Sequence, residues 1–185
     1  IQYFKVFNSK GYPLKFQKIT KDSWKISTPN CSELILKYNY YANELNAGST
    51  YLDEMQLYVN PVNCCLYIPN RMDEPCIVNL EIPSSYKIAC SLAQNKHQLK
   101  AKNYDELAES PWIASNSLQH NKYRIQGVDF HIWFQGKCKL DWIRILNDFK
   151  AFTSHQINDF ISFPVSEYHF INQILPYKAY HGVEH

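Results

Sequence analysis

The feature that most constrains the fold is a series of short apolar–polar alternations through the first hundred residues. In the clearest run, Leu34, Leu36, Tyr38 and Tyr40 alternate with polar neighbours and so share one face. A period of two residues is typical of a strand with one face buried. Runs this short, separated by Pro, Asn, Ser and Gly, predict a mainly β fold, an antiparallel β-sandwich or saddle.

The other runs of the same kind fill the rest of this region. They comprise a hairpin formed by 14–16 and 24–26, strands over 66–68, 76–82 and 86–90, and a short strand over 98–101. We therefore assign residues 1–103 to an N-terminal β domain.

Residues 103–111 are predicted to form a junction. Asn103 followed by Glu106 is typical of a capping box that opens one helical turn, and Pro111 ends it. The acids Asp105 and Glu109 lie beside it, and paired catalytic carboxylates are one interpretation of them. We favour capping and hinge roles, because local backbone hydrogen bonding accounts for the acids.

Beyond the junction, residues 104–185 predict a small α+β segment. A hairpin around Gly127 is followed from Leu140 by apolar residues at helical spacing, and an apolar strand begins near Tyr168. His131 lies on the strand face that also carries Asp129. A single histidine on a strand is more often structural than a ligand, so we expect it to be structural.

Composition excludes several classes of protein. A net charge of +2 over 185 residues, with scattered Lys and Arg, predicts no nucleic-acid surface. No run approaches the roughly 18 apolar residues of a membrane span.

The six cysteines lack the spacing of a zinc site, and adjacent Cys64 and Cys65 are expected on opposite faces of a strand. Free thiols favour a cytoplasmic location slightly over the cell envelope.

Catalytic motifs are missing from this sequence. It has no His-Glu-x-x-His, no G-x-S-x-G and no phosphate-binding glycine loop. We therefore expect no catalytic residue and no metal ligand within these 185 residues.

Five short motifs nevertheless occur in a familiar order. They are Y-D-E-L at 104–107, E-S-P at 109–111, F-P at 163–164, Y-H-F at 168–170 and G-V-E-H at 182–185. In order and approximate spacing the chain resembles the glycyl-aminopeptidase family, bacterial zinc metallopeptidases that usually carry a PDZ domain. The resemblance covers most of residues 24–185.

The resemblance implies that this chain is the front part of a longer enzyme. Residues 104–185 would begin a thermolysin-like catalytic lobe, and the zinc helix and PDZ domain would follow it. The complete enzyme would use zinc to remove small, glycyl residues from peptides with a free amino terminus. The fragment alone would be inactive and would bind no zinc.

The same resemblance assigns a role to the end of the chain. In the related aminopeptidase-N family, a strand of similar sequence lies beside the active site, and its Glu binds the substrate's amino terminus. By similarity Glu184 would be that anchor, with Gly182 and Val183 offering backbone to the peptide. A carboxylate suits an ammonium group because the pair is charge-assisted. His181 replaces the first glycine of the family motif.

A second interpretation is a non-catalytic β-sandwich that binds carbohydrate or a protein partner. Fourteen tyrosines and four tryptophans could form an aromatic platform for either ligand. Aromatic residues are also simply favoured in strands. Replacing Glu184 distinguishes the two interpretations, because loss of this acid should leave sugar binding unchanged.

Overall fold

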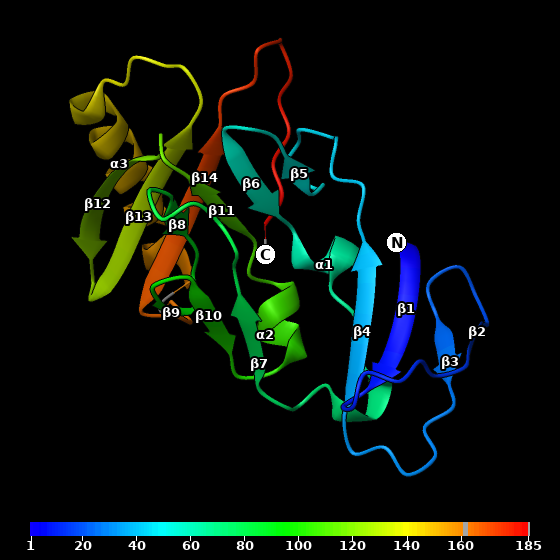
Figure 1. Cartoon of the computed structure of the whole chain (residues 1–185). Helices are drawn as coiled ribbons and strands as arrows, with labels where there is room; N and C mark the ends of the chain where they lie inside the picture. The colour runs from blue at the N-terminus through cyan, green and yellow to red at the C-terminus, as the bar shows by residue number, and fades with distance from the viewer. Residues whose placement is uncertain (161–162, 185) are drawn as a thin grey trace. The chain divides into compact units, whose positions relative to one another are not determined.

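The computed structural model describes residues 1–160 and 163–184. The chain divides into two compact units, Ile1–Tyr41 and Ala42–His185. Each unit is described by itself below, with the elements labelled in Figure 1.

The first unit consists of two antiparallel strand pairs. β1 (Gln2–Asn8) pairs with β4 (Leu34–Asn39), and β2 (Phe16–Lys18) pairs with β3 (Trp24–Ile26). The ring of Phe4 on β1 stacks on Trp24 at 4.6 Å and meets the edge of Phe16 at 5.0 Å. The predicted 14–16/24–26 hairpin and the alternating strand from Leu34 are confirmed, with Leu34, Leu36 and Tyr38 on the less exposed face.

The second unit opens with two antiparallel sheets. The four-stranded sheet has the order β5 (Tyr51–Leu52), β6 (Gln56–Val59), β11 (Trp112–Ser115), β8 (Lys87–Ala89). The three-stranded sheet has the order β7 (Cys76–Asn79), β10 (Gln98–Ala101), β9 (Ala93–Asn95). Short helical turns lie between the strands: α1 (Pro61–Cys64), η1 (Pro69–Arg71) and α2 (Tyr104–Ala108).

The last part of this unit is a three-stranded sheet covered by a long helix. β12 (Gln119–Ile125) forms a hairpin with β13 (Val128–Gln135), and α3 (Trp142–Phe160) then leads to β14 (Glu167–Gln173), which lies parallel to β13. Figure 1 shows α3 running along this sheet. Its apolar stripe packs against buried Tyr123, Phe130 and Ile132 on one sheet face. On the opposite face, Trp133 and Ile171 pack against a second apolar cluster that includes Tyr58 and Ile113.

The predicted mainly β fold with a small α+β segment is confirmed, and strands 98–101 and 167–173 lie where the alternation indicated. The capping box is also formed: the Asn103 side chain accepts the Glu106 N–H at 2.8 Å. The Glu106 carboxylate, however, accepts from the N–H of Lys102 and not of Asn103.

The strands expected at Cys64–Cys65 and over 66–68 are wrong. Cys64 ends a helical turn that starts at Pro61, where proline at the first helical position favours the turn, and residues 65–68 are irregular. The predicted boundary at residue 103 also falls inside a compact unit, because Tyr104 and Leu107 of α2 are buried in the core that contains Leu99. None of the six cysteines, all of which lie within the described residues, forms a disulfide bond. Within the described residues, no helix is both long and apolar enough to cross a membrane.

Candidate functional site

The second unit contains a large open cavity of about 1580 Å³. Strand β14 and the chain that follows it form one side, and the end of α3 adjoins them. The opposite side comes from helix α2 with its flanking residues and from the loop at Asn46 and Ala47. Residues far apart in the sequence therefore meet around one space.

Carboxylates dominate the charge of this cavity. Of the described residues that line it, five are acidic and one, Lys102, is a lysine; the acids are Asp105, Glu106, Glu109, Glu167 and Glu184. The chain as a whole carries a net charge of +2. The acids therefore give the cavity a local charge of opposite sign, which attracts cationic groups.

The segment after β14 reaches the cavity as irregular chain. The Tyr177 hydroxyl donates to the Leu45 carbonyl at 3.1 Å. A Cβ placed on Gly48 would lie 3.3 Å from His181 Cε1 and 3.8 Å from Val183 Cγ2, so these side chains pack closely on Gly48. Gly48 is itself fixed, since its carbonyl accepts from Asn63 Nδ2 at 2.7 Å.

All three predicted substrate-binding residues, Gly182, Val183 and Glu184, line the cavity. They are not in a strand, so the expected strand at this place is corrected: the ladder of β14 ends at Gln173, and Pro176 interrupts the chain soon after. The space beside Gly182 is open, because a Cβ there would meet nothing within 4 Å. Burial raises the pKa of Tyr168, and the charge of nearby Glu184 adds to the rise. His185 lies outside the described residues.

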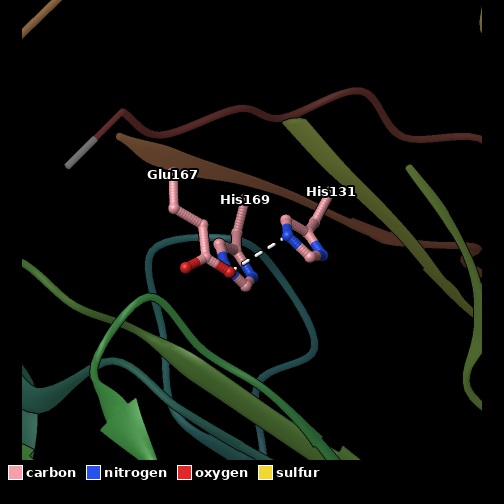
Figure 2. A group of neighbouring side chains, drawn as sticks. All are labelled: His131, Glu167 and His169. Carbon is pink, nitrogen blue, oxygen red and sulfur yellow. Dashed lines mark hydrogen bonds and ion pairs between the residues drawn. The ribbon is translucent and has the colours of Figure 1, made fainter. Parts of the chain in front are cut away.

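A second group of side chains lies on β13 and β14, on the sheet face away from α3. The parallel register places His131 directly beside His169, and their rings stack at 4.6 Å and 8°. Glu167 begins β14, and its Oε1 lies 3.0 Å from His131 Nε2 and 3.1 Å from His169 Nε2. Figure 2 shows the carboxylate turned toward both rings.

Two further residues complete this group. His120 Nε2 lies 2.9 Å from His131 Nδ1, and the indole N–H of Trp133 donates to His169 Nδ1 at 3.1 Å. His120 pairs with Trp133 across the β12–β13 hairpin, and their rings stack at 3.8 Å. Each ring nitrogen on His131 and His169 therefore has a defined neighbour.

Burial differs sharply within the group. The side chains of His169 and His131 are 7% and 13% exposed, whereas that of Glu167 is 51% exposed. Burial first, and then the nearness of His131, lowers the pKa of His169 to about 4, against the opposing effect of Glu167. Burial likewise lowers the pKa values of His131 and His120. The histidines are therefore neutral at pH 7, with lone pairs on the nitrogens that carry no proton.

Sequence reasoning treated His131 as a single structural residue and missed its neighbours. His131 and His169 are 38 residues apart, and the helix α3 lies between them. The available signal was that both occupy the polar positions of apolar alternations. Only the register of β13 with β14 brings them together.

Comparison with known proteins agrees with this architecture. Residues 1–116 match the family model of the Peptidase M61 N-terminal domain. The crystal structure of an aminopeptidase N family protein from Idiomarina loihiensis superposes with a TM-score of 0.84 at 24% sequence identity. This likeness, which concerns the fold, covers 93% of the present chain and 30% of the other. No curated protein matches the chain. Because the family model covers more than half of its residues, the chain belongs to the Peptidase M61 N-terminal domain family.

Proposed function

We propose that this chain is the amino-terminal part of a zinc aminopeptidase that releases small, glycyl residues from peptides, and that Glu184 binds the free amino terminus of the substrate. The family membership supports a peptidase parent. The glycyl preference and a PDZ domain further along rest on the motif resemblance. The observation that carries the proposal is the position of Glu184 on a cavity lined by five carboxylates.

The chemistry of the cavity suits a substrate with a positive end. A peptide ammonium group paired with a carboxylate forms a charge-assisted hydrogen bond, which fixes where the peptide starts. The open space beside Gly182 leaves room for a peptide backbone. Glu184, together with Gly182 and Val183, would thereby set the distance from the first residue to the scissile bond.

The catalytic zinc is assigned to a segment outside this chain. The sequence contains no His-Glu-x-x-His, and the one His/Glu group among the described residues lies on strands. Zinc in such enzymes polarises the scissile carbonyl and activates water. The residues described here would bind and orient the peptide, so this chain alone should not hydrolyse glycyl peptides.

The test replaces Glu184 with glutamine in the parent enzyme. Loss of a hydrogen bond to a charged group costs about 1.5–3 kcal/mol, so kcat/KM on glycyl peptides should fall about 10- to 100-fold. Glu109→Gln is the matched control, because Glu109 is an exposed acid of the same cavity and its side chain has no hydrogen bond among the described residues. That variant should retain wild-type turnover.

An amino-acetylated peptide provides the second control. It has no ammonium group to bind, so any residual hydrolysis of it should be the same in Glu184→Gln and wild type. Unchanged turnover of free glycyl peptides in Glu184→Gln would show that Glu184 is not the anchor.

A further inference from the structure

We propose that His131, His169 and Glu167 bind a divalent transition-metal ion such as Zn²⁺. One donor atom from each residue lies within 4.8 Å of the other two. Two imidazole nitrogens and one carboxylate oxygen are a common ligand set for zinc with an open fourth position.

Two of the three distances between the donor atoms are already close to those that zinc needs. Oε1 of Glu167 lies 3.0 Å and 3.1 Å from the two Nε2 atoms. With zinc–ligand bonds of about 2.0–2.1 Å, ligand atoms of a tetrahedral site lie roughly 3.3 Å apart. The two Nε2 atoms lie within 4.8 Å of each other. Binding would need a small retreat of Glu167, whose side chain is half exposed and can move, while the strand register holds the two imidazoles beside each other.

Access and the outer contacts of the site also fit a metal ion. Glu167 and His169 line the carboxylate-rich cavity, so a cation can approach from that side and keep a water as its fourth ligand. His131 Nδ1 lies 2.9 Å from His120 Nε2, which can accept its proton. Metal-bound histidines usually donate their second ring N–H in this way.

The hydrogen bond from Trp133 to His169 should weaken metal binding, and this effect can be measured. Its N–H donates to His169 Nδ1, so neutral His169 carries its proton on Nε2, toward Glu167. Zinc at Nε2 moves that proton to Nδ1, where it faces the Trp133 N–H and the hydrogen bond is lost. Leaving such a pair unsatisfied weakens binding about 10- to 100-fold. Removing the indole N–H should therefore strengthen metal binding.

The experiment titrates Zn²⁺ into the metal-stripped 185-residue chain against a chromophoric chelator. We expect one equivalent to bind to the wild type, and His131→Ala, His169→Ala and Glu167→Gln to lose at least 100-fold in affinity. His155→Ala is the control, because His155 is exposed on α3, and it should bind as the wild type does. Trp133→Phe should bind about tenfold more tightly than the wild type.

Cobalt(II) distinguishes this site from binding by the cysteines. Imidazole and carboxylate ligands give d–d bands without the near-ultraviolet thiolate charge-transfer band. A thiolate band, or stoichiometric zinc retained in both His131→Ala and Glu167→Gln, would overturn the proposal. So would the absence of saturable binding, or Trp133→Phe binding no more tightly than wild type. Glu167→Gln keeps the test valid if His169→Ala does not fold, since Glu167 is half exposed.

This inference does not depend on the proposed function, because all ligands lie within the present chain and the readout is metal binding. The effect of Glu184→Gln on turnover of the parent enzyme can be measured whether or not His131, His169 and Glu167 bind zinc. The two experiments therefore fail independently.

Discussion

Replacing Gly136 with alanine tests how the end of β13 fixes the chain that leaves β14. Gly136 has a φ of +110°, and a Cβ there would lie 2.8 Å from the Ile174 carbonyl oxygen and 3.0 Å from Ile174 Cβ. Ile174 also donates its N–H to the Gln135 carbonyl at 2.8 Å. The backbone at Ile174 therefore cannot retreat from an added methyl group without losing this hydrogen bond.

The expected cost is the sum of three effects. A positive φ costs alanine roughly 1–2 kcal/mol. The smaller entropy of the unfolded alanine chain offsets about 0.4–1 kcal/mol of this. Loss of the Ile174 hydrogen bond adds about 1 kcal/mol. Gly136→Ala should thus lower the free energy of unfolding by about 2 kcal/mol, which for a chain of this size lowers Tm by roughly 4–8 °C.

Gly127→Ala is the matched control. Gly127 has a φ of +86°, but a Cβ there would meet nothing within 4 Å. Only the conformational terms remain, so the expected loss is about 0.5–1 kcal/mol, or roughly 1–4 °C in Tm. Thermal unfolding followed by circular dichroism measures both variants. Equal Tm values for the two would refute the close contact between Gly136 and Ile174 and the path that it sets for the chain toward Glu184.

Two further predictions concern the core under α3. The Thr153 hydroxyl donates to the Phe149 carbonyl at 2.7 Å and so accepts from buried Tyr123 at 3.1 Å. Thr153→Val leaves the Tyr123 hydroxyl without an acceptor and should cost about 1–3 kcal/mol in urea unfolding, whereas Tyr123→Phe should cost about 1 kcal/mol or less; the opposite order would contradict this. Phe130 is 1% exposed and Phe160 is 78% exposed. Phe130→Ala should therefore cost about 3–5 kcal/mol, and Phe160→Ala should stay within about 0.5 kcal/mol; similar losses would contradict the assigned core.

The local structure of this chain could be predicted from its sequence because neighbouring residues carry the information. Alternation with a period of two residues placed the strand from Leu34, and helical spacing after Leu140 placed α3. Asn103 marked the start of α2, since its side chain caps a backbone N–H only three residues away. The order of short motifs, each a local pattern, pointed to a peptidase, and the match over residues 1–116 then showed the Peptidase M61 N-terminal domain family.

Contacts between distant residues were decided by the tertiary structure. Residue 103, the predicted boundary, lies within the unit Ala42–His185, where Tyr104 and Leu107 bury their side chains in a core built by strands on both sides of them. The position of Glu184 on the cavity likewise depends on Gly48 and Leu45, more than 130 residues earlier.

The group formed by His131, Glu167 and His169 is the clearest case of this division. The sequence by itself placed both histidines on strands, because alternation is local. Whether the two histidines meet depends on the register of β13 with β14, and a shift of one residue would turn one imidazole to the face covered by α3. That register is set by apolar residues such as Phe130 and Phe170 packing under α3, through side-chain contacts that no local pattern contains.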